Sequence, residues 1–233
     1  MAERDVEPGA ADSATRLRIR MLLVGVVLIA ASFALGVWIT VKGEPPFVID
    51  AWWNETLAQA TASPFLLIVS YTMNFLGGGW FGVFAVPILT AVVLIVLRRP
   101  WSALYFVSAS LAGALVVQLM KHIFGRARPD EIIVLTDVGS YPSGHVANAA
   151  TVAVAFAIIF PRLWVALVGA GWVLLMAFSR TYLHAHWLSD TFGGALVGSG
   201  VSLALGAGFA VLIAREHARH HRPDPALDAS NPR

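Results

Sequence analysis

Three short groups of polar residues interrupt a largely apolar sequence between positions 121 and 190. They supply three cations, a serine, a glycine, two histidines and one carboxylate, which in chain order are Lys121, Arg128, Ser143, Gly144, His145, Arg180, His186 and Asp190. Phosphoryl transfer depends on positioning and on cations that stabilise charge on the phosphate oxygens, and these residue types suit that reaction. The sequence therefore predicts a phosphate-transfer site built from three separate segments.

The three cations are predicted to bind the phosphate. Arginine holds phosphate oxygens through two parallel hydrogen bonds, and a cation at the end of an apolar run is costly unless it has a role there. Taken singly, Lys121, Arg128 or Arg180 would be equally consistent with a side chain that extends to the outer membrane surface. Together, at fixed spacings from two histidines, they favour phosphate binding.

The segment Pro142-Ser143-Gly144-His145 is expected to open a helix. Serine is a common N-cap, free N–H groups at a helix start bind anions, and glycine allows a phosphate to approach the backbone closely. We therefore expect Ser143 and Gly144 to bind the phosphate and His145 to donate a proton. A plain N-cap beside a histidine at the membrane interface is the alternative.

His186 and Asp190 are four residues apart, a spacing that places two side chains on one face of a helix. An aspartate that accepts a hydrogen bond from one ring nitrogen would fix the tautomer and leave the other nitrogen free to attack. We therefore predict His186 as the nucleophile that forms a phosphohistidine, Asp190 as its orienting residue and His145 as the acid. A purely structural hydrogen bond within the helix is the alternative.

Two other chemistries fit the same residues less well. His184, His186 and Asp190 are types that bind zinc, but the surrounding cations would repel a metal and suit an anion. Ser143 with a histidine and Asp190 would suit a serine hydrolase, but no Gly-x-Ser-x-Gly elbow follows a strand. The chain has no cysteine for thiolate chemistry or metal binding. We expect neither a metal nor another cofactor.

The composition is typical of a membrane protein. Apolar residues make up 58% of the 233 residues, charged residues make up 13%, and the mean hydropathy is +0.72, whereas soluble proteins carry about 25% charged residues. A helix needs about 20 apolar residues to cross the hydrocarbon core. We expect an all-α bundle of six spans at 21–41, 80–97, 101–120, 146–160, 163–178 and 187–214. A signal peptide is the alternative for the first range, which is longer than such a peptide's apolar core.

The remaining segments are predicted to lie outside the spans. Residues 1–15 and 215–233 are expected to be disordered cytoplasmic tails, the second of them basic, around a membrane domain at 16–214. Trp52 and Trp53 suit the aromatic belt at the headgroup level, so an interfacial helix is expected between the first two spans. Residues 64–76 would cover only about 20 Å as a helix, too little to cross, and the three glycines at 77–79 are expected to end them.

The distribution of cations predicts the orientation. Lysine and arginine accumulate in cytoplasmic loops, and an inside N-terminus with six spans places these arginines inside: Arg16, Arg18, Arg20, Arg98, Arg99, Arg162, Arg215 and Arg219. The same count places both termini in the cytoplasm and all three polar groups on the periplasmic or extracellular side of a multi-pass plasma-membrane protein. The net charge of +2 is small and its cations form no stripe, which argues against nucleic acid as a partner.

The three polar groups read Lys-x6-Arg-Pro, Pro-Ser-Gly-His and Ser-Arg-x5-His-x3-Asp. In this order they resemble the tripartite signature of the type 2 phosphatidic acid phosphatases, over about residues 100–205. The resemblance implies phosphate binding by Lys121, Arg128, Ser143, Gly144 and Arg180, and catalysis by His186, Asp190 and His145. It also implies a metal-free reaction on a membrane lipid phosphate such as phosphatidate, phosphatidylglycerophosphate or undecaprenyl diphosphate.

We therefore expect an integral-membrane phosphatase that acts on a lipid phosphate, with membrane lipids as its surroundings. A lipid phosphotransferase with the same phosphohistidine is one alternative, because it differs only in the acceptor. A non-catalytic protein that binds or transports lipid phosphates is another, although the pair His186 and Asp190 argues against it, since binding needs cations but no nucleophile. The sequence leaves the lipid and the oligomeric state open.

Overall fold

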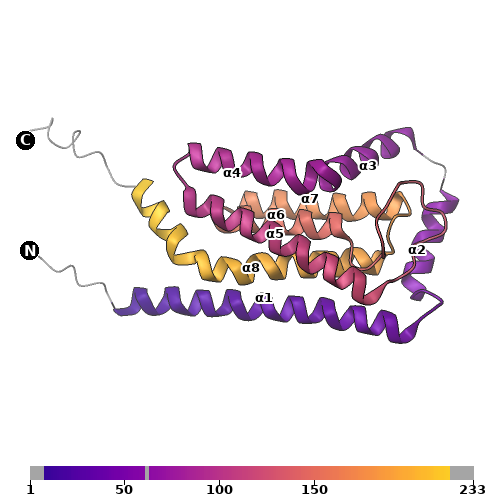
Figure 1. Cartoon of the computed structure of the whole chain (residues 1–233), viewed down its shortest axis with the longest axis horizontal. Helices are drawn as coiled ribbons and strands as arrows, with labels where there is room; N and C mark the ends of the chain where they lie inside the picture. The colour runs from indigo at the N-terminus through magenta and orange to yellow at the C-terminus, as the bar shows by residue number, and fades with distance from the viewer. Residues whose placement is uncertain (1–7, 61–62, 221–233) are drawn as a thin grey trace, which may run out of the picture.

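The computed structural model describes residues 8–60 and 63–220, and its regular structure there is entirely helical (Figure 1). The all-α prediction is thus confirmed for the described part of the chain. In chain order the helices are α1 (Pro8–Lys42), α2 (Val48–Gln59), α3 (Pro64–Gly77), the π-helical turn η1 (Phe81–Ala85), α4 (Val86–Val96), α5 (Pro100–Phe124), α6 (Gly144–Ile159), α7 (Leu163–Tyr182) and α8 (Leu188–His220).

Several of these helices are long and apolar enough to cross a membrane, which fits a multi-pass membrane protein. Within the described residues, α1, α5, α7 and α8 meet this requirement singly. Helix α3 and the η1–α4 segment meet it together, as a pair bent by 49°. Helix α6 is apolar but has only 16 residues. The count of six spans therefore stays a prediction.

The bend between α3 and η1 differs from the expected end of a short apolar segment at the three glycines. The chain instead continues through the break, where Gly79 adopts a left-handed φ of +56° that favours glycine. A broken helix leaves carbonyl groups unpaired, and these need partners in a membrane. Asn148 supplies them, because its Nδ2 lies 3.2 Å from the Gly77 carbonyl and 3.0 Å from the Gly82 carbonyl.

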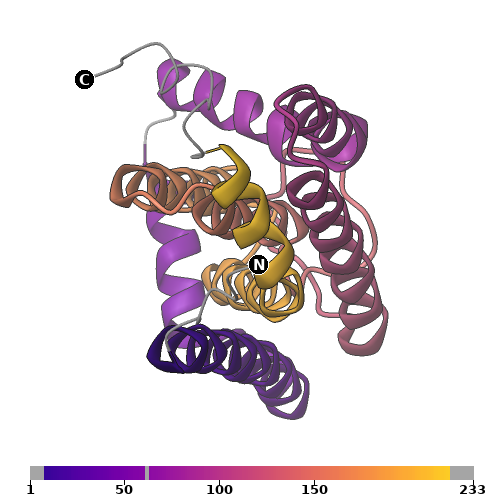
Figure 2. The same cartoon turned by 90° about the vertical axis from the view of Figure 1, so that its left-hand side faces the viewer.

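Helix α8 lies between α1 and α6, as the view along the bundle shows (Figure 2). Glycines allow these helices to approach closely. A Cβ at Gly25 or at Gly200 would overlap backbone of the other helix, and a Cβ at Gly194 or Gly198 would overlap backbone at the start of α6. Small residues in α8 thus allow close helix contacts, as is common between membrane helices.

The bundle has two distinct ends (Figure 1). One end holds the start of α1 and the last turns of α8, and the other holds α2 and the connection from α5 to α6. The tails differ from the sequence-based expectation, because α1 already begins at Pro8 and α8 continues through residue 220. The rest of the expected tails, residues 1–7 and 221–233, lies outside the described residues.

Candidate active site

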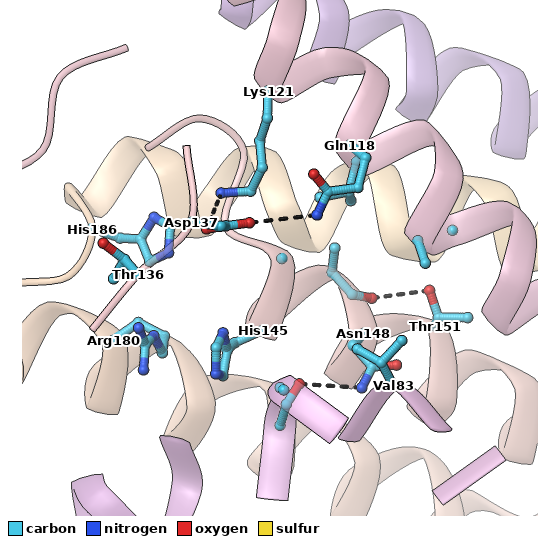
Figure 3. Close-up of a pocket in the computed structure, with 18 of the residues that line it drawn as sticks. Val83, Gln118, Lys121, Thr136, Asp137, His145, Asn148, Thr151, Arg180 and His186 are labelled. Carbon is cyan, nitrogen blue, oxygen red and sulfur yellow. Dashed lines mark hydrogen bonds and ion pairs between the residues drawn. The ribbon is translucent and has the colours of Figure 1, made fainter. Parts of the chain in front are cut away.

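The three polar groups meet at the α2 end of the bundle, around one cavity of about 500 Å³ (Figure 3). Six of the eight predicted site residues line it, namely Lys121, Arg128, Gly144, His145, Arg180 and His186. Ser143 and Asp190 are fully buried beside them. They come from the end of α5, the loop that follows it, the start of α6, the end of α7 and the start of α8. Chain topology therefore brings together residues that are up to 69 positions apart in the sequence.

Two of the predicted cations share the same acceptors. Lys121, in the last turn of α5, is 2% exposed and donates from Nζ to the Gly139 carbonyl at 2.8 Å. Arg128 donates from Nη2 to the same carbonyl at 2.7 Å. Both also contact Oδ1 of Asp137, at 3.2 Å from Lys121 and 2.9 Å from Arg128. Two cations thus converge on one anionic position.

Two other predicted phosphate ligands carry buried polar atoms without a partner among the described residues, namely Ser143 Oγ and Arg180 Nε. Buried polar groups are nearly always hydrogen-bonded, so each such atom needs an explanation. Arg180 is 1% exposed, and its Nη1 donates to Asn74 Oδ1. Both unpaired atoms belong to residues that we expect to hold the substrate phosphate.

Gly144 follows the N-cap Ser143 and begins α6. A Cβ at this position would make only ordinary contact with Val117 at 3.6 Å, so protein packing alone does not require glycine. Since Gly144 lines the cavity, close approach of a ligand to its backbone is the better explanation.

His186 presents one unprotonated ring nitrogen to the cations. Its Nδ1 lies 2.8 Å from the Ser140 carbonyl, which can only accept, so Nδ1 carries the proton. Its Nε2 lies 3.3 Å from Nη1 of Arg128 and keeps its lone pair. Burial and then the charges of Arg180, Arg128 and Lys121 lower the pKa of His186 well below its usual value. The ring is therefore neutral, as a nucleophile must be.

Asp190 is placed differently from the expectation. His186 lies in the turn before α8 and not on its first turn, and its Nδ1 is 3.7 Å from Oδ2 of Asp190, beyond hydrogen-bond distance. The Asp190 carboxylate instead accepts from Ser140 Oγ, from Trp187 N at 2.9 Å and from Arg126 Nη1 at 2.5 Å. Ser140 therefore links the two, because its carbonyl binds His186 while its hydroxyl binds Asp190.

His145 lines the cavity beside Arg180 (Figure 3). Its Nε2 lies 3.1 Å from the Asn74 carbonyl of α3, so this nitrogen carries a proton. The backbone directly after α3 packs against the imidazole ring, since a Cβ at Gly78 would overlap it. The position of the His145 ring therefore requires a glycine at position 78, and the sequence pattern alone did not reveal this contact.

Sequence reasoning missed several residues that contact the predicted site. Arg126 binds Asp190, Ser140 links Asp190 to His186, Asn74 binds both His145 and Arg180, and Asp137 binds two cations. The first arginine of Gly125-Arg126-Ala127-Arg128, a further cation beside the predicted Arg128, was a signal for Arg126. No comparable signal marked Asn74, which lies in an apolar run.

Comparison with known proteins agrees with this arrangement. Residues 102–211 match the PAP2 superfamily, and this match covers the three polar groups. This region belongs to the PAP2 superfamily. The family predicted from the three motifs is therefore confirmed.

Relatives of the PAP2 region carry phosphatase names. The chain is 30% identical over 133 residues to a lipid A 1-phosphatase of Rhizobium etli, covering 51% of this chain and 52% of that protein. It is 28% identical over 120 residues to an undecaprenyl-diphosphatase of Sulfolobus acidocaldarius, covering 48% and 58%. The chain thus spans a little over half the length of each of these relatives.

Two solved structures share the fold. The crystal structure of a transmembrane PAP2-type phosphatidylglycerolphosphate phosphatase from Bacillus subtilis has a TM-score of 0.52 at 20% identity, covering 89% of this chain and 98% of that one. The crystal structure of Aquifex aeolicus LpxE has a TM-score of 0.55 at 22% identity, covering 72% and 96%. At these identities the likeness extends to the fold alone.

Proposed function

We propose that the protein is an integral-membrane phosphatase that removes phosphate from a lipid phosphomonoester or diphosphate. The observation that carries this proposal is the pair of unpaired buried atoms, Ser143 Oγ and Arg180 Nε, beside two further cations and a neutral His186. An anion with several acceptor oxygens would satisfy these atoms together. The named activities of the PAP2 relatives support the same reaction.

The reaction follows from the roles of these groups. The lone pair of His186 Nε2 attacks the phosphorus, and the bond from phosphorus to the lipid oxygen breaks. His145, whose Nε2–H stays on the Asn74 carbonyl, acts in its protonated form and gives the proton of its other ring nitrogen, Nδ1, to that leaving oxygen. His145 then takes a proton from water, which attacks the phosphohistidine and releases inorganic phosphate. Lys121, Arg128 and Arg180 stabilise charge on the phosphate oxygens throughout.

A lipid substrate is supported by the rest of the cavity wall. Beyond the cations the cavity continues between helices, where Val83, Gly113, Ala114 and Val117 form the small and apolar part of a wall that also carries Ser110, Gln118, Asn148 and Thr151. The small and apolar part of this wall suits an alkyl chain. Phosphatidate, phosphatidylglycerophosphate and undecaprenyl diphosphate all combine an alkyl chain with a phosphate and are the candidate substrates.

We place the site on the outer face of the plasma membrane and both termini in the cytoplasm. The distribution of cations supports this orientation. Arg98, Arg99 and Arg162 flank the connections α4–α5 and α6–α7, at the opposite ends of these helices from the cavity residues of α5, α6 and α7. Helix α2, at the cavity end, would then lie at the outer headgroup level.

The decisive experiment measures phosphate release by the purified protein from short-chain phosphatidate, phosphatidylglycerophosphate and undecaprenyl diphosphate in EDTA. We expect turnover, inhibition by vanadate, and loss of turnover in His186→Ala. Loss of wild-type activity in EDTA would overturn the metal-free mechanism, and full activity of His186→Ala would overturn the nucleophile. Binding of these lipids without any turnover would favour the non-catalytic alternative.

Phosphotransfer is tested in the same preparation with an added lipid alcohol. A phosphatase releases inorganic phosphate in proportion to the substrate consumed. A phosphotransferase would instead phosphorylate the lipid alcohol, and inorganic phosphate would fall short of the substrate consumed.

A further inference from the structure

Helix α2 turns polar residues inward and apolar residues outward. Asp50 is 0% exposed and Asn54 is 9% exposed, whereas Val48 and Trp52 are 86% and 55% exposed. Asp50 and Asn54 are four residues apart and therefore lie on one face. Buried polar side chains of this kind require specific partners, and a buried carboxylate requires a positive one. The residues that Asp50 and Asn54 bind therefore indicate the role of α2.

Within the described part of the chain, the Asp50 side chain forms hydrogen bonds with Arg126, which binds Asp190, and with Ser189, which precedes Asp190. Its Oδ1 accepts from Ser189 N at 2.8 Å, and its Oδ2 accepts from Ser189 Oγ at 2.6 Å and from Arg126 Nη2 at 2.7 Å. Ser189 lies in the first turn of α8, directly before Asp190. A carboxylate from α2 thus binds a free N–H at the start of the helix that carries Asp190.

Arg126 joins Asp50 to Asp190. Its Nη2 binds Asp50, and its Nη1 lies 2.5 Å from Oδ1 of Asp190 and 2.7 Å from Ser189 Oγ. The guanidinium is 7% exposed and is shared by two carboxylates that are both fully buried. Loss of one partner of a buried ion pair leaves the remaining charges unbalanced. Without the charge of Asp50, the guanidinium would act on Asp190 alone.

Asn54 holds the other side of the nucleophile segment. Its Nδ2 donates to Oε2 of Glu131 at 2.9 Å, so its Oδ1 accepts from Nδ1 of His184 at 2.7 Å. His184 has a left-handed φ of +52° and lies two residues before His186. The inner face of α2 therefore binds the chain on both sides of His186, at 184 and at 189.

We infer that α2 is a positioning element of the phosphatase reaction, in which Asp50 acts through Arg126 and Ser189 on Asp190, and Asn54 helps fix the backbone of His186. As His186 Nε2 attacks, positive charge develops on the imidazole, and the carboxylate of Asp190, whose Oδ2 lies 3.7 Å from Nδ1, stabilises that charge. Asp50 offsets the charge of Arg126 and so preserves that stabilisation. This inference rests on the proposed function.

The test is the variant Asp50→Asn in the full chain, assayed with a short-chain lipid phosphate and with p-nitrophenyl phosphate. Because misplacement of reacting groups by about 1 Å costs on the order of a hundredfold in rate, we expect kcat to fall about tenfold to a hundredfold for both substrates. KM and the inhibition constant of vanadate should stay near wild type, since Lys121, Arg128 and Arg180 are untouched. The exposed Glu55 on the same helix provides the control, Glu55→Gln, with wild-type kcat.

A double-mutant cycle separates this role from a general loss of stability. If Asp50 acts through Arg126, then Asp50→Asn combined with Arg126→Gln should lower kcat no further than Arg126→Gln alone. Additive losses would overturn the inference, as would wild-type kcat in Asp50→Asn. A loss confined to the lipid substrate would also overturn it, because it would make α2 a lipid contact.

A second variant keeps the inference testable. If Asp50→Asn does not fold, Ser189→Ala removes only the hydroxyl that Asp50 and Arg126 share, and it should lower kcat at unchanged KM. An unchanged kcat in Ser189→Ala would then count against the inference. Failure of the proposed function is seen separately, as a wild-type protein that releases no phosphate from any substrate.

Discussion

Asp137 forms an ion pair with Arg128 inside the group of cations that we assign to the substrate phosphate, with Oδ1 lying 2.9 Å from Nη2. The same oxygen lies 3.2 Å from Nζ of Lys121. Burial alone would raise the pKa of Asp137, but Lys121 and then Arg128 lower it below its usual value. An ionised carboxylate with a half-exposed side chain thus takes the place of an anion, and a substrate phosphate has to displace it.

Asp137→Asn is therefore expected to bind anions more tightly. A partly exposed ion pair is worth up to about 1 kcal/mol. An anion that must displace Asp137 from the cations is therefore expected to bind roughly three- to fivefold more weakly than it would without this carboxylate. We expect inhibition constants for inorganic phosphate and vanadate to fall by about this factor. Asp130→Asn, an exposed carboxylate in the same loop, is the control. Unchanged or weaker inhibition of Asp137→Asn would contradict the competition.

Gly78→Ala should impair the proton donor. The added Cβ would overlap the His145 imidazole and displace it from the cavity. A misplaced acid slows substrates with poor leaving groups most, so we expect kcat to fall about a hundredfold for an alkyl phosphate and much less for p-nitrophenyl phosphate. Gly171→Ala, whose Cβ would meet no atom within 4 Å, is the matched control. Equal losses for both substrates would argue against His145 as the acid.

The low pKa of His186 predicts the pH dependence of stability. The folded protein keeps this ring neutral, whereas the same residue in the unfolded chain takes up a proton below about pH 6.5. The unfolded state then binds more protons, so the free energy of unfolding falls as pH drops below about 6.5 and is unaffected by this group above it. The loss amounts to at most about 1.4 kcal/mol for each pH unit.

Thermal unfolding in detergent measures this effect. Between about pH 7.5 and pH 5.5, the wild type should lose more Tm than His186→Gln, which has no ring to protonate. His122→Gln, at an exposed position of α5, should follow the wild type. The same pH dependence in His186→Gln and the wild type would exclude a buried neutral His186.

The absence of cysteine allows a direct test of the proposed orientation. Leu135, fully exposed in the loop beside the cavity, is replaced by cysteine, and Pro161, exposed between α6 and α7, provides the matched control. A membrane-impermeant maleimide should label Leu135→Cys in intact cells and Pro161→Cys only after permeabilisation. The reverse pattern would place the cavity in the cytoplasm.

The residues that the sequence could predict are those whose chemistry is unusual for their surroundings. Lys121 and Arg180 are cations at the ends of apolar runs, and His186 lies at a fixed spacing from Asp190. Such features are visible without coordinates because burying a charge in a membrane is costly and therefore needs a reason. The structure brings Lys121, Arg180 and His186 to the wall of one cavity, with Asp190 buried beside it.

Other features depend on packing that no local pattern encodes. Asp50 and Asn74 look like ordinary polar residues, and their partners lie 76 and 106 positions away. The continuity of α3 into η1 depends on Asn148, which binds both sides of the break. The missing hydrogen bond from His186 to Asp190 follows from a helix that begins two residues later than the spacing suggested.

Because Asp50 and Asn74 bind residues of the site, a fragment of this protein needs both of them to keep the site intact. Residues 102–211 match the PAP2 superfamily, but both of these residues lie before that region. A fragment cut at the family boundary would leave Arg126 without one of its carboxylates and Arg180 without the side-chain acceptor on α3. Expressed fragments and chimaeras of this protein should therefore keep α2 and α3 together with the catalytic motifs.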